Sequence, residues 1–210
     1  MSRGIPFVVA APSGTGKTTV CRRLLEADPG LVFSVSHTTR PRRNGERDGV
    51  DYHFVAKAGF DRLVAEDAFL EWAVYNDNRY GTSWRAIEAP LAEGRDVLLE
   101  IEVQGARQVR QRLPEARLVF LLPPSLAALE ERLRARGANS AGDIARRLET
   151  ARGELAAIAE FDYAVVNEDL ARCVEDVLAI VVAERAGSAG PLRARFDPRP
   201  AALRFAAAHP

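Results

Sequence analysis

The sequence predicts an α/β fold in which helices flank an open, mostly parallel sheet. Three observations indicate this class: short apolar segments of strand length, helical spacing in the segments that follow them, and loops with Gly or Pro between the two. The predicted buried strands are residues 5–11, 31–36, 97–101, 117–122 and 163–167. The predicted helices are residues 17–27, 104–113, 126–135, 144–158 and 170–181.

The helices are predicted from apolar residues that recur on one face and from signals at their ends. In the first helix Val20 and Leu24 share a face, and residues 28–30 (Asp-Pro-Gly) end it. Ser125 is a suitable N-cap for the helix that follows it. The longest helix has its apolar residues at helical spacing, at Ile144, Leu148, Ala151, Leu155 and Ile158.

Two segments depart from the alternation of strands and helices. Residues 37–94 are less regular, and we expect them to form an inserted subdomain. Their candidate strands are residues 52–55 and 69–75, and their candidate helices lie near residues 57–67 and 83–93. Residues 186–210 are rich in Ala and Pro without periodicity and predict a disordered tail. The core is therefore expected in residues 1–36 and 95–185.

Composition excludes several classes of protein. There are 29 Lys and Arg residues against 29 Asp and Glu, whereas binding nucleic acid through bulk charge needs a basic excess. No apolar segment approaches the ~20 residues of a membrane span, and residues 5–11 run directly into a glycine-rich loop instead of a signal-peptide cleavage site. Cys21 and Cys173 form no metal or disulfide pattern, which favours a reducing, cytoplasmic location. The three histidines lack zinc-ligand spacing.

A glycine-rich loop connects the first predicted strand to the first helix. Its residues are Ala11, Pro12, Ser13, Gly14, Thr15, Gly16, Lys17 and Thr18. They match the P-loop pattern, except that Ala11 replaces the first glycine. Gly14 and Gly16 permit positive φ, so that backbone N–H groups turn toward an anion at the helix N-terminus. The pattern places Lys17 on the β- and γ-phosphates of a nucleotide and the Thr18 hydroxyl on Mg²⁺.

The alternative interpretation of this loop is a glycine-rich turn with a solvated lysine, but the strand before it and the helix after it favour a nucleotide site. The loop alone does not define the reaction. The Asn-Lys-x-Asp segment with which GTPases read guanine is absent from the sequence. The acceptor of the phosphoryl group must therefore be inferred from other residues.

A cluster of arginines supplies a candidate acceptor site. Arg40, Arg42, Arg43 and Arg47 lie within eight positions of a chain with no net charge. Planar guanidinium groups bind phosphate in a bidentate manner, and tyrosine hydroxyls nearby can add donors. A solvated basic loop is the alternative.

The motif around these arginines is specific. Residues 36–54 contain T-T-R-x-x-R-x-G-E-x-x-G-x-D-Y-x-F, and this segment resembles the guanylate kinase family. The likeness extends over about residues 5–185. It implies the reaction ATP + GMP ⇌ ADP + GDP with Mg²⁺, with dGMP as a further acceptor. It also implies that residues 37–94 are a GMP-binding subdomain.

The resemblance assigns roles on the GMP side. The residues implied to hold the GMP phosphate are Ser36, Arg40, Arg43, Tyr52 and Tyr80. Glu71, in Phe-Leu-Glu-Trp, is implied to read guanine, and the hydroxyl of Thr82 to meet the other edge of the base. A carboxylate only accepts hydrogen bonds, and guanine offers a parallel pair of donors where adenine has a bare acceptor. The alternative for Glu71 is an ordinary surface glutamate.

Two further acidic residues lie in a segment that matches a family motif except at their own positions. Residues 99–105 match L-D-I-D-x-Q-G, but Glu100 and Glu102 stand at the two Asp positions. Because a strand end lies near the phosphates, these carboxylates can serve guanine or Mg²⁺. The alternative is that they are only charges at the start of a helix.

On the ATP side the resemblance implies Arg136 and Arg147, on a lid of about residues 134–147, and Asn167 near adenine. Arginines on a lid can neutralise the transferring phosphoryl and exclude water, although most arginines here would also suit a solvated helix face. The implied catalytic residues are Lys17, Arg40, Arg136 and Arg147. No strong general base is needed, because the acceptor phosphate is already largely dianionic near neutral pH.

Two rival functions stay open at the level of sequence. A P-loop kinase for another nucleotide is opposed by Glu71 and Thr82. A guanylate-kinase-like scaffold module that binds phosphorylated peptides is opposed by Lys17 and Thr18, since such a module has no use for a nucleotide cradle. We expect ATP and GMP as partners, no nucleic acid and no membrane.

Overall fold

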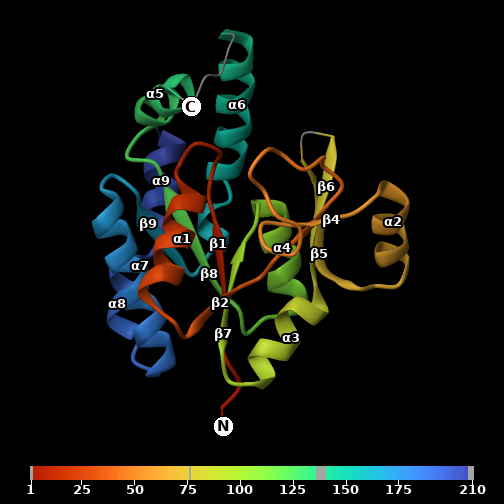
Figure 1. Ribbon diagram of the computed structural model, residues 1–210. Coiled ribbons are helices and arrows are strands. Elements are labelled where there is room, and N and C mark those ends of the chain that lie inside the picture. Colours follow the sequence, from red (N-terminus) through yellow and green to blue (C-terminus); the bar gives the residue numbers. More distant parts are fainter. Residues whose placement is uncertain (1, 76, 136–140, 208–210) are drawn as a thin grey trace. The chain divides into compact units, whose positions relative to one another are not determined.

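The computed structural model describes residues 2–75, 77–135 and 141–207. The chain divides into two compact units: the first unit is Met1–Pro6 with Gly30–Ala116, and the second unit is Phe7–Pro29 with Arg117–Pro210. Strands that pair in parallel, with helices beside them, are present in each unit (Figure 1). The predicted α/β class, with a mostly parallel sheet and flanking helices, is confirmed. Among the described helices, none combines the length and the hydropathy that spanning a bilayer requires.

The first unit contains a parallel strand pair and a second, small sheet. In the pair, β2 (Leu31–Phe33) lies beside β7 (Asp96–Glu100). The small sheet has the strand order β4-β3-β6-β5, so β5 is one of its outer strands. Its members are β3 (His37–Thr38), β4 (His53–Phe54), β5 (Phe69–Tyr75) and β6 (Asn78–Ser83). β6 pairs antiparallel with both β3 and β5.

Three helices complete the first unit: α2 (Lys57–Ala65), α3 (Trp84–Ala92) and α4 (Val103–Arg112). Phe60 of α2 is fully buried and stacks on Phe69 of β5, with ring centroids 4.6 Å apart. α4 packs along β5 (Figure 1). These contacts hold the small sheet that contains Glu71, Tyr80 and Thr82 of the predicted GMP-binding residues.

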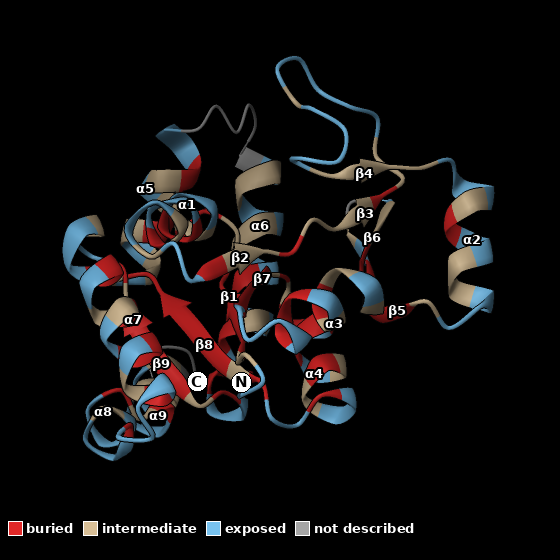
Figure 2. Ribbon diagram, turned by 60° about the horizontal axis from the view of Figure 1, so that its bottom comes forward, coloured by how far each residue is buried: buried red, intermediate tan, exposed pale blue. Residues whose placement is uncertain are grey.

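The second unit is built on three parallel strands, β1 (Pro6–Ala10), β8 (Arg117–Leu122) and β9 (Tyr163–Val166), with β8 between the other two. Its first helices are α1 (Lys17–Ala27), α5 (Leu126–Ala135) and α6 (Ala141–Leu155). The remaining helices are the 3₁₀ turn η1 (Ile158–Glu160), α7 (Leu170–Arg185), α8 (Gly190–Arg195) and α9 (Pro198–Ala207). Apolar residues of β1 and β8 are almost fully buried, as Figure 2 shows.

Two pairs of helices pack together in the second unit. α1 packs on α7, where Cys21 and Cys173 are buried, as expected for small apolar side chains, and neither forms a disulfide bond. α5 packs on α6 through Leu129, Leu133 and Ala151. Ser125 caps α5, since its hydroxyl accepts a hydrogen bond from the N–H of Ala128 at 3.1 Å.

The prediction of a disordered tail over residues 186–210 is wrong for the described part of that segment. Residues 190–207 form α8 and α9, and α9 packs on η1 and β9. Phe196, between the two helices, is 8% exposed, and its carbonyl accepts a hydrogen bond from the N–H of Ala164 in β9 at 2.8 Å. The segment is therefore part of the second unit and covers the outer edge of β9. Residues 208–210 lie outside the described residues.

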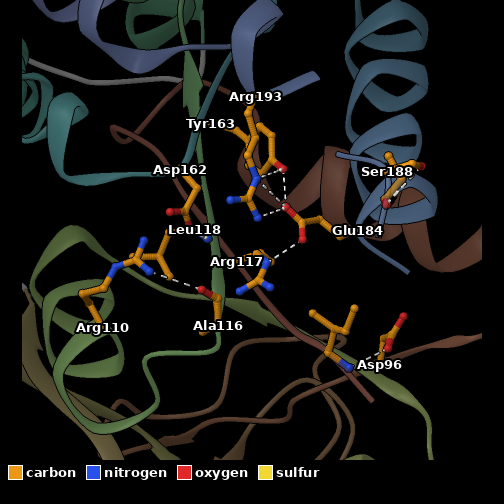
Figure 3. Close-up of polar contacts among 12 residues, drawn as sticks. Asp96, Arg110, Ala116, Arg117, Leu118, Asp162, Tyr163, Glu184, Ser188 and Arg193 are labelled. Atoms are coloured by element: carbon orange, nitrogen blue, oxygen red, sulfur yellow. Dashed lines mark hydrogen bonds and ion pairs between the residues drawn. The ribbon is translucent and has the colours of Figure 1, made fainter. Parts of the chain in front are cut away.

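A buried carboxylate ties this segment to the rest of the second unit (Figure 3). Glu184 of α7 is 8% exposed and accepts hydrogen bonds from Arg193 of α8 at 2.7 Å, from Arg117 of β8 at 2.6 Å and from the Tyr163 hydroxyl. Burial alone would raise the pKa of Glu184, but the hydrogen bonds from Tyr163, Arg117 and Arg193 outweigh it and lower the pKa. Burial and the neighbouring carboxylate raise the pKa of Tyr163 to about 12, so the phenol keeps its proton.

Because the pKa of Glu184 is lower in the folded chain than in the unfolded one, its contribution to stability is fully present above the ordinary pKa and is lost as the pH falls through the folded pKa. We expect Glu184→Gln to lower the free energy of unfolding by about 2 kcal/mol at neutral pH. The difference from the unsubstituted chain should shrink as the pH is lowered through the folded pKa of Glu184. Denaturant unfolding at a series of pH values measures it, and a difference independent of pH would contradict this account.

Candidate active site

The phosphate loop has the geometry that its glycines predict. It follows β1 and ends in α1, and Gly14 and Gly16 have φ values of +95° and +100°. The N–H of Thr15 donates to the carbonyl of Pro12 at 3.1 Å, which closes the turn. Gly16 is the N-cap of α1 and supplies no side-chain oxygen to the first N–H groups, as at helix N-termini that bind anions. Ala11 is 1% exposed, so the departure from the P-loop pattern is accommodated as a packed methyl group.

Two side chains from distant parts of the second unit brace this loop. The side-chain amide of Asn167, just after β9, donates to the carbonyl of Thr15 at 2.7 Å. Arg132 of α5 donates to the same carbonyl at 3.3 Å and to the carbonyl of Asn167 at 2.9 Å. Thr15 is fully buried and Asn167 is 6% exposed. Asn167 therefore holds the loop directly, while its predicted place near adenine stays a prediction.

The close approach at Gly16 leads to a testable expectation. A Cβ atom there would lie 2.8 Å from the amide nitrogen of Asn167, in addition to the strain of a positive φ. We expect Gly16→Ala to lower the free energy of unfolding by about 2 kcal/mol and to weaken ADP binding, as measured by denaturant unfolding and calorimetry. Gly153→Ala is the matched control, because no described atom outside its neighbours and the adjacent backbone of α6 lies within 4 Å of its Cβ position. It should stabilise the chain by about 0.5–1 kcal/mol, and equal effects of the two changes would refute the expectation.

Of the two predicted donor-side arginines, one lies in the described residues. Arg147 lies on α6 and is half-buried, in the same unit as the phosphate loop. Arg136 lies outside the described residues. The lid formed by these arginines stays a prediction.

On the acceptor side, the first unit brings together Ser36, Glu71 and Thr82. Glu71 is on β5 and Thr82 is opposite it on β6. The Thr82 hydroxyl donates to Oε1 of Glu71 at 2.6 Å, and the hydroxyls of Ser36 and Thr82 lie 3.3 Å apart. Glu71 is 3% exposed, so the alternative of an ordinary surface glutamate is wrong. A buried carboxylate held by a hydroxyl is suited to read a donor edge of a small molecule.

A second cluster gathers Arg40, Tyr52 and Tyr80. The Arg40 guanidinium lies over the Tyr52 ring, 5.4 Å from its centroid, and the rings of Tyr52 and Tyr80 are 5.9 Å apart. Both terminal nitrogens of Arg40 donate to the carboxylate of Glu46, at 3.1 and 2.7 Å. The hydrogen bonds to Glu46 raise the pKa of Arg40 above its ordinary value, so the cation is permanent.

Glu46 is a residue whose role the sequence reasoning missed. Besides pairing with Arg40, its carboxylate accepts a hydrogen bond from the backbone N–H of Arg43 at 2.7 Å. It therefore orders the turn that carries both arginines. The glutamate stands in the family motif, which was the available signal. Arg42, Arg43 and Arg47 are exposed, as the solvated-loop alternative expects, and the role of Arg43 at the GMP phosphate stays a prediction.

Comparison with known proteins decides the family. A family model described as guanylate kinase matches residues 3–184. The chain belongs to the guanylate kinase family. A relative named guanylate kinase from Neisseria meningitidis serogroup A is 54% identical over 183 residues, which cover 87% of this chain and 89% of the relative. Another, from Syntrophotalea carbinolica, is 50% identical over 181 residues, 86% of each chain.

A solved structure supports the same conclusion for the fold. The crystal structure of guanylate kinase from Anaplasma phagocytophilum is similar to this chain with a TM-score of 0.73 and 32% identity, over 91% of this chain and 90% of that one. The resemblance stated from the sequence motifs is thus confirmed over nearly the whole chain.

The two family acids of residues 99–105 lie where the alternation of elements predicted them. Glu100 is the last residue of β7, and Glu102 is the N-cap residue of α4. Both are half-buried. The position of Glu102 also suits a simple charge at a helix start, so the contacts of these guanylate kinase residues with guanine or Mg²⁺ stay predictions.

A magnesium ion that binds together with a nucleotide would need few ligands from the protein. Among the described residues, no three His, Cys, Asp or Glu side chains are grouped as metal ligands. Mg²⁺ is commonly held by one or two protein oxygens together with nucleotide phosphates and water. The exposed hydroxyl of Thr18, in the first turn of α1, is a donor of that kind.

Proposed function

We propose that the protein transfers the γ-phosphoryl group of Mg-ATP to GMP, giving ADP and GDP. The observation that supports this most is the buried carboxylate of Glu71 with the Thr82 hydroxyl on one of its oxygens. Besides the family membership, this carboxylate gives a physical reason why the site would select guanine. The N1–H and exocyclic amine of guanine can donate side by side to a carboxylate, whereas adenine would leave a buried charge unpaired.

The phosphate of GMP would be bound beside this base site. We assign it to the hydroxyls of Ser36, Tyr52 and Tyr80 and to the guanidinium groups of Arg40 and Arg43. Arg40 is already held by Glu46 and by the Tyr52 ring, so little side-chain entropy is lost when an anion binds. Glu100 and Glu102 are proposed to face the nucleotide from the end of β7.

The donor nucleotide would lie on the phosphate loop, residues 11–18, and the start of α1. Backbone N–H groups and Lys17 would bind its phosphates, and Thr18 would bind Mg²⁺. An ion bound there would supply positive charge against the nucleotide phosphates. Asn167 would then border the adenine, and Arg136 and Arg147 would cover the phosphates from a lid of about residues 134–147.

The chemistry needs alignment and charge neutralisation more than proton transfer. The GMP phosphate is a dianionic nucleophile near neutral pH, so no strong general base is required. Lys17, Arg40, Arg136 and Arg147 are proposed to stabilise the charge on the transferring phosphoryl group. Exclusion of water by the lid would prevent hydrolysis of ATP. The cytoplasm suits an enzyme with two buried thiols that form no disulfide bond.

A coupled assay of ADP formation tests the proposal directly. Purified protein with Mg-ATP should turn over GMP at least about 10³-fold more efficiently than AMP, CMP or UMP, in line with the discrimination that a hydrogen-bonding site achieves. Equal rates with all four acceptors would refute the role of Glu71. Absence of turnover with GMP would refute the enzyme and favour the phosphopeptide-binding module.

A further inference from the structure

The side chain of Gln108 makes an unusual pair of contacts with the strand that carries Glu71. Gln108 lies on α4, and its amide nitrogen donates to the carbonyl of Trp72 at 2.7 Å. Its amide oxygen accepts a hydrogen bond from the N–H of the same residue at 3.1 Å. The side-chain amide thus pairs with both backbone groups of one β5 residue, as a neighbouring strand would.

In the described part of the chain, β5 has a neighbouring strand on one side only, and its pairing with that strand is irregular. β5 is an outer strand of the small sheet. Its register with β6 shifts between Phe69 and Glu71, which indicates a β-bulge at Leu70. A bulge re-aims the side chains beside it and disrupts the local ladder. The direction of the Glu71 side chain therefore depends on contacts outside the β5–β6 ladder.

α4 supplies such contacts on both sides of the bulge. Gly105, Gln108 and Arg112 are spaced to lie on one face of this helix. Arg112 donates to the carbonyl of Phe69 at 2.8 Å, before the bulge, and Gln108 holds Trp72 after it. Glu71 lies between these two points on the strand.

The same helix face approaches the carboxylate itself. A Cβ atom on Gly105 would lie 2.4 Å from Oε2 of Glu71, so the carboxylate is packed against the glycine of α4. Its other oxygen, Oε1, accepts the hydrogen bond from Thr82. A small movement of β5 relative to α4 would therefore shift the carboxylate against Gly105.

We infer that Gln108 is a positioning residue for base recognition: it locks the backbone of Trp72 to α4 and so fixes the carboxylate of Glu71 in the orientation that reads guanine. This inference rests on the proposed function, since it takes Glu71 as the reader of the base. Gln108 acts through the strand and has no contact with the substrate in this account.

The test compares Gln108→Met, which keeps the length of the side chain but removes both hydrogen bonds, with Gln111→Met. Gln111 is exposed on the same helix and provides the matched control. Calorimetry measures Kd for GMP and for inosine monophosphate, which lacks only the exocyclic amine of guanine. Steady-state kinetics give kcat and the KM for ATP, and thermal unfolding gives Tm.

We expect Gln108→Met to weaken GMP binding about tenfold and to reduce the preference for GMP over inosine monophosphate by a similar factor, the equivalent of one charge-assisted hydrogen bond. The KM for ATP should stay within about twofold, because the phosphate loop lies in other elements. Gln111→Met should behave as the unsubstituted chain. Gln108→Asn, whose shorter amide cannot reach both groups of Trp72, should show an intermediate loss and serves if the methionine variant does not fold.

A lower Tm with an unchanged preference between the two nucleotides would overturn the inference, since Gln108 would then only cover a strand edge. The proposed function is tested separately by the unsubstituted protein. If that protein fails to phosphorylate GMP or to prefer it over inosine monophosphate, the proposed function fails and the inference with it. If it passes and Gln108→Met equals Gln111→Met, only the inference fails.

Discussion

Replacing Lys17 with methionine is expected to lower kcat/KM for phosphoryl transfer about 10³-fold, the largest effect that a single change in the donor site should produce. Lys17 is the first residue of α1, directly after the left-handed Gly16. There its ammonium adds a full charge to the partial positive charge of the helix N-terminus. Methionine keeps the length and most of the volume but removes the charge. The affinity for GMP, measured by calorimetry, should not change.

The chain offers an exact control for the loss of a lysine. Its only other lysine is Lys57, which is exposed at the start of α2. Lys57→Met should leave kcat/KM within about twofold, as most surface substitutions do. Comparable losses for both variants, in the coupled assay, would show that the phosphate loop has no special part in the reaction.

Glu71→Gln is the change expected to damage acceptor selectivity most. The amide keeps the shape of the carboxylate and an oxygen for the Thr82 hydroxyl, but it replaces one acceptor with a donor and removes the charge. That donor would face the donor edge of guanine in a site where Glu71 is 3% exposed. We expect kcat/KM for GMP to fall about 10³-fold, and kcat/KM for AMP to stay level or rise.

The measurement is the ratio of kcat/KM values for GMP and AMP in the coupled assay. Glu66→Gln, on an exposed residue just after α2, is the control for loss of a carboxylate in the same unit. It should leave the ratio unchanged. If Glu71→Gln lowered both activities equally, Glu71 would support the structure of the site and would not select the base.

Several elements could be predicted from the sequence to the residue. α1, β5 and β8 occupy residues 17–27, 69–75 and 117–122, as expected. In each, the local signals agree: apolar residues at one period, and Gly, Pro or charged residues at the ends. β6 could not be predicted, because its sequence Asn-Arg-Tyr-Gly-Thr-Ser has little apolar character. It is a strand because β3 and β5 pair with it on both sides.

The error over residues 186–210 has a similar cause. Proline suggested an irregular segment, but Pro191 and Pro198 stand in the first turns of α8 and α9, where a missing N–H costs nothing. Alanine and arginine are good helix formers at the positions that follow. The backbone of β9, which fixes the segment through the carbonyl of Phe196, is remote in sequence.

The candidate site divides in the same way. Residues that belong to a spaced motif, such as Arg40 and Glu71, were found from the sequence. The roles of three supporting residues were not found: Glu46, although it stands in the motif, holds Arg40, Arg132 holds Thr15, and Gln108 holds Trp72. A polar side chain that pairs with a distant carbonyl leaves no periodic or local signal.

The carbonyl of Phe196 that accepts the N–H of Ala164 has a consequence for the behaviour of the chain in concentrated solution. A strand edge with open N–H groups recruits other chains and leads to aggregation. The α8–α9 segment shields such an edge on β9, and so contributes to keeping copies of the protein apart. Shortening the chain from its C-terminus would cost colloidal solubility before it cost catalysis.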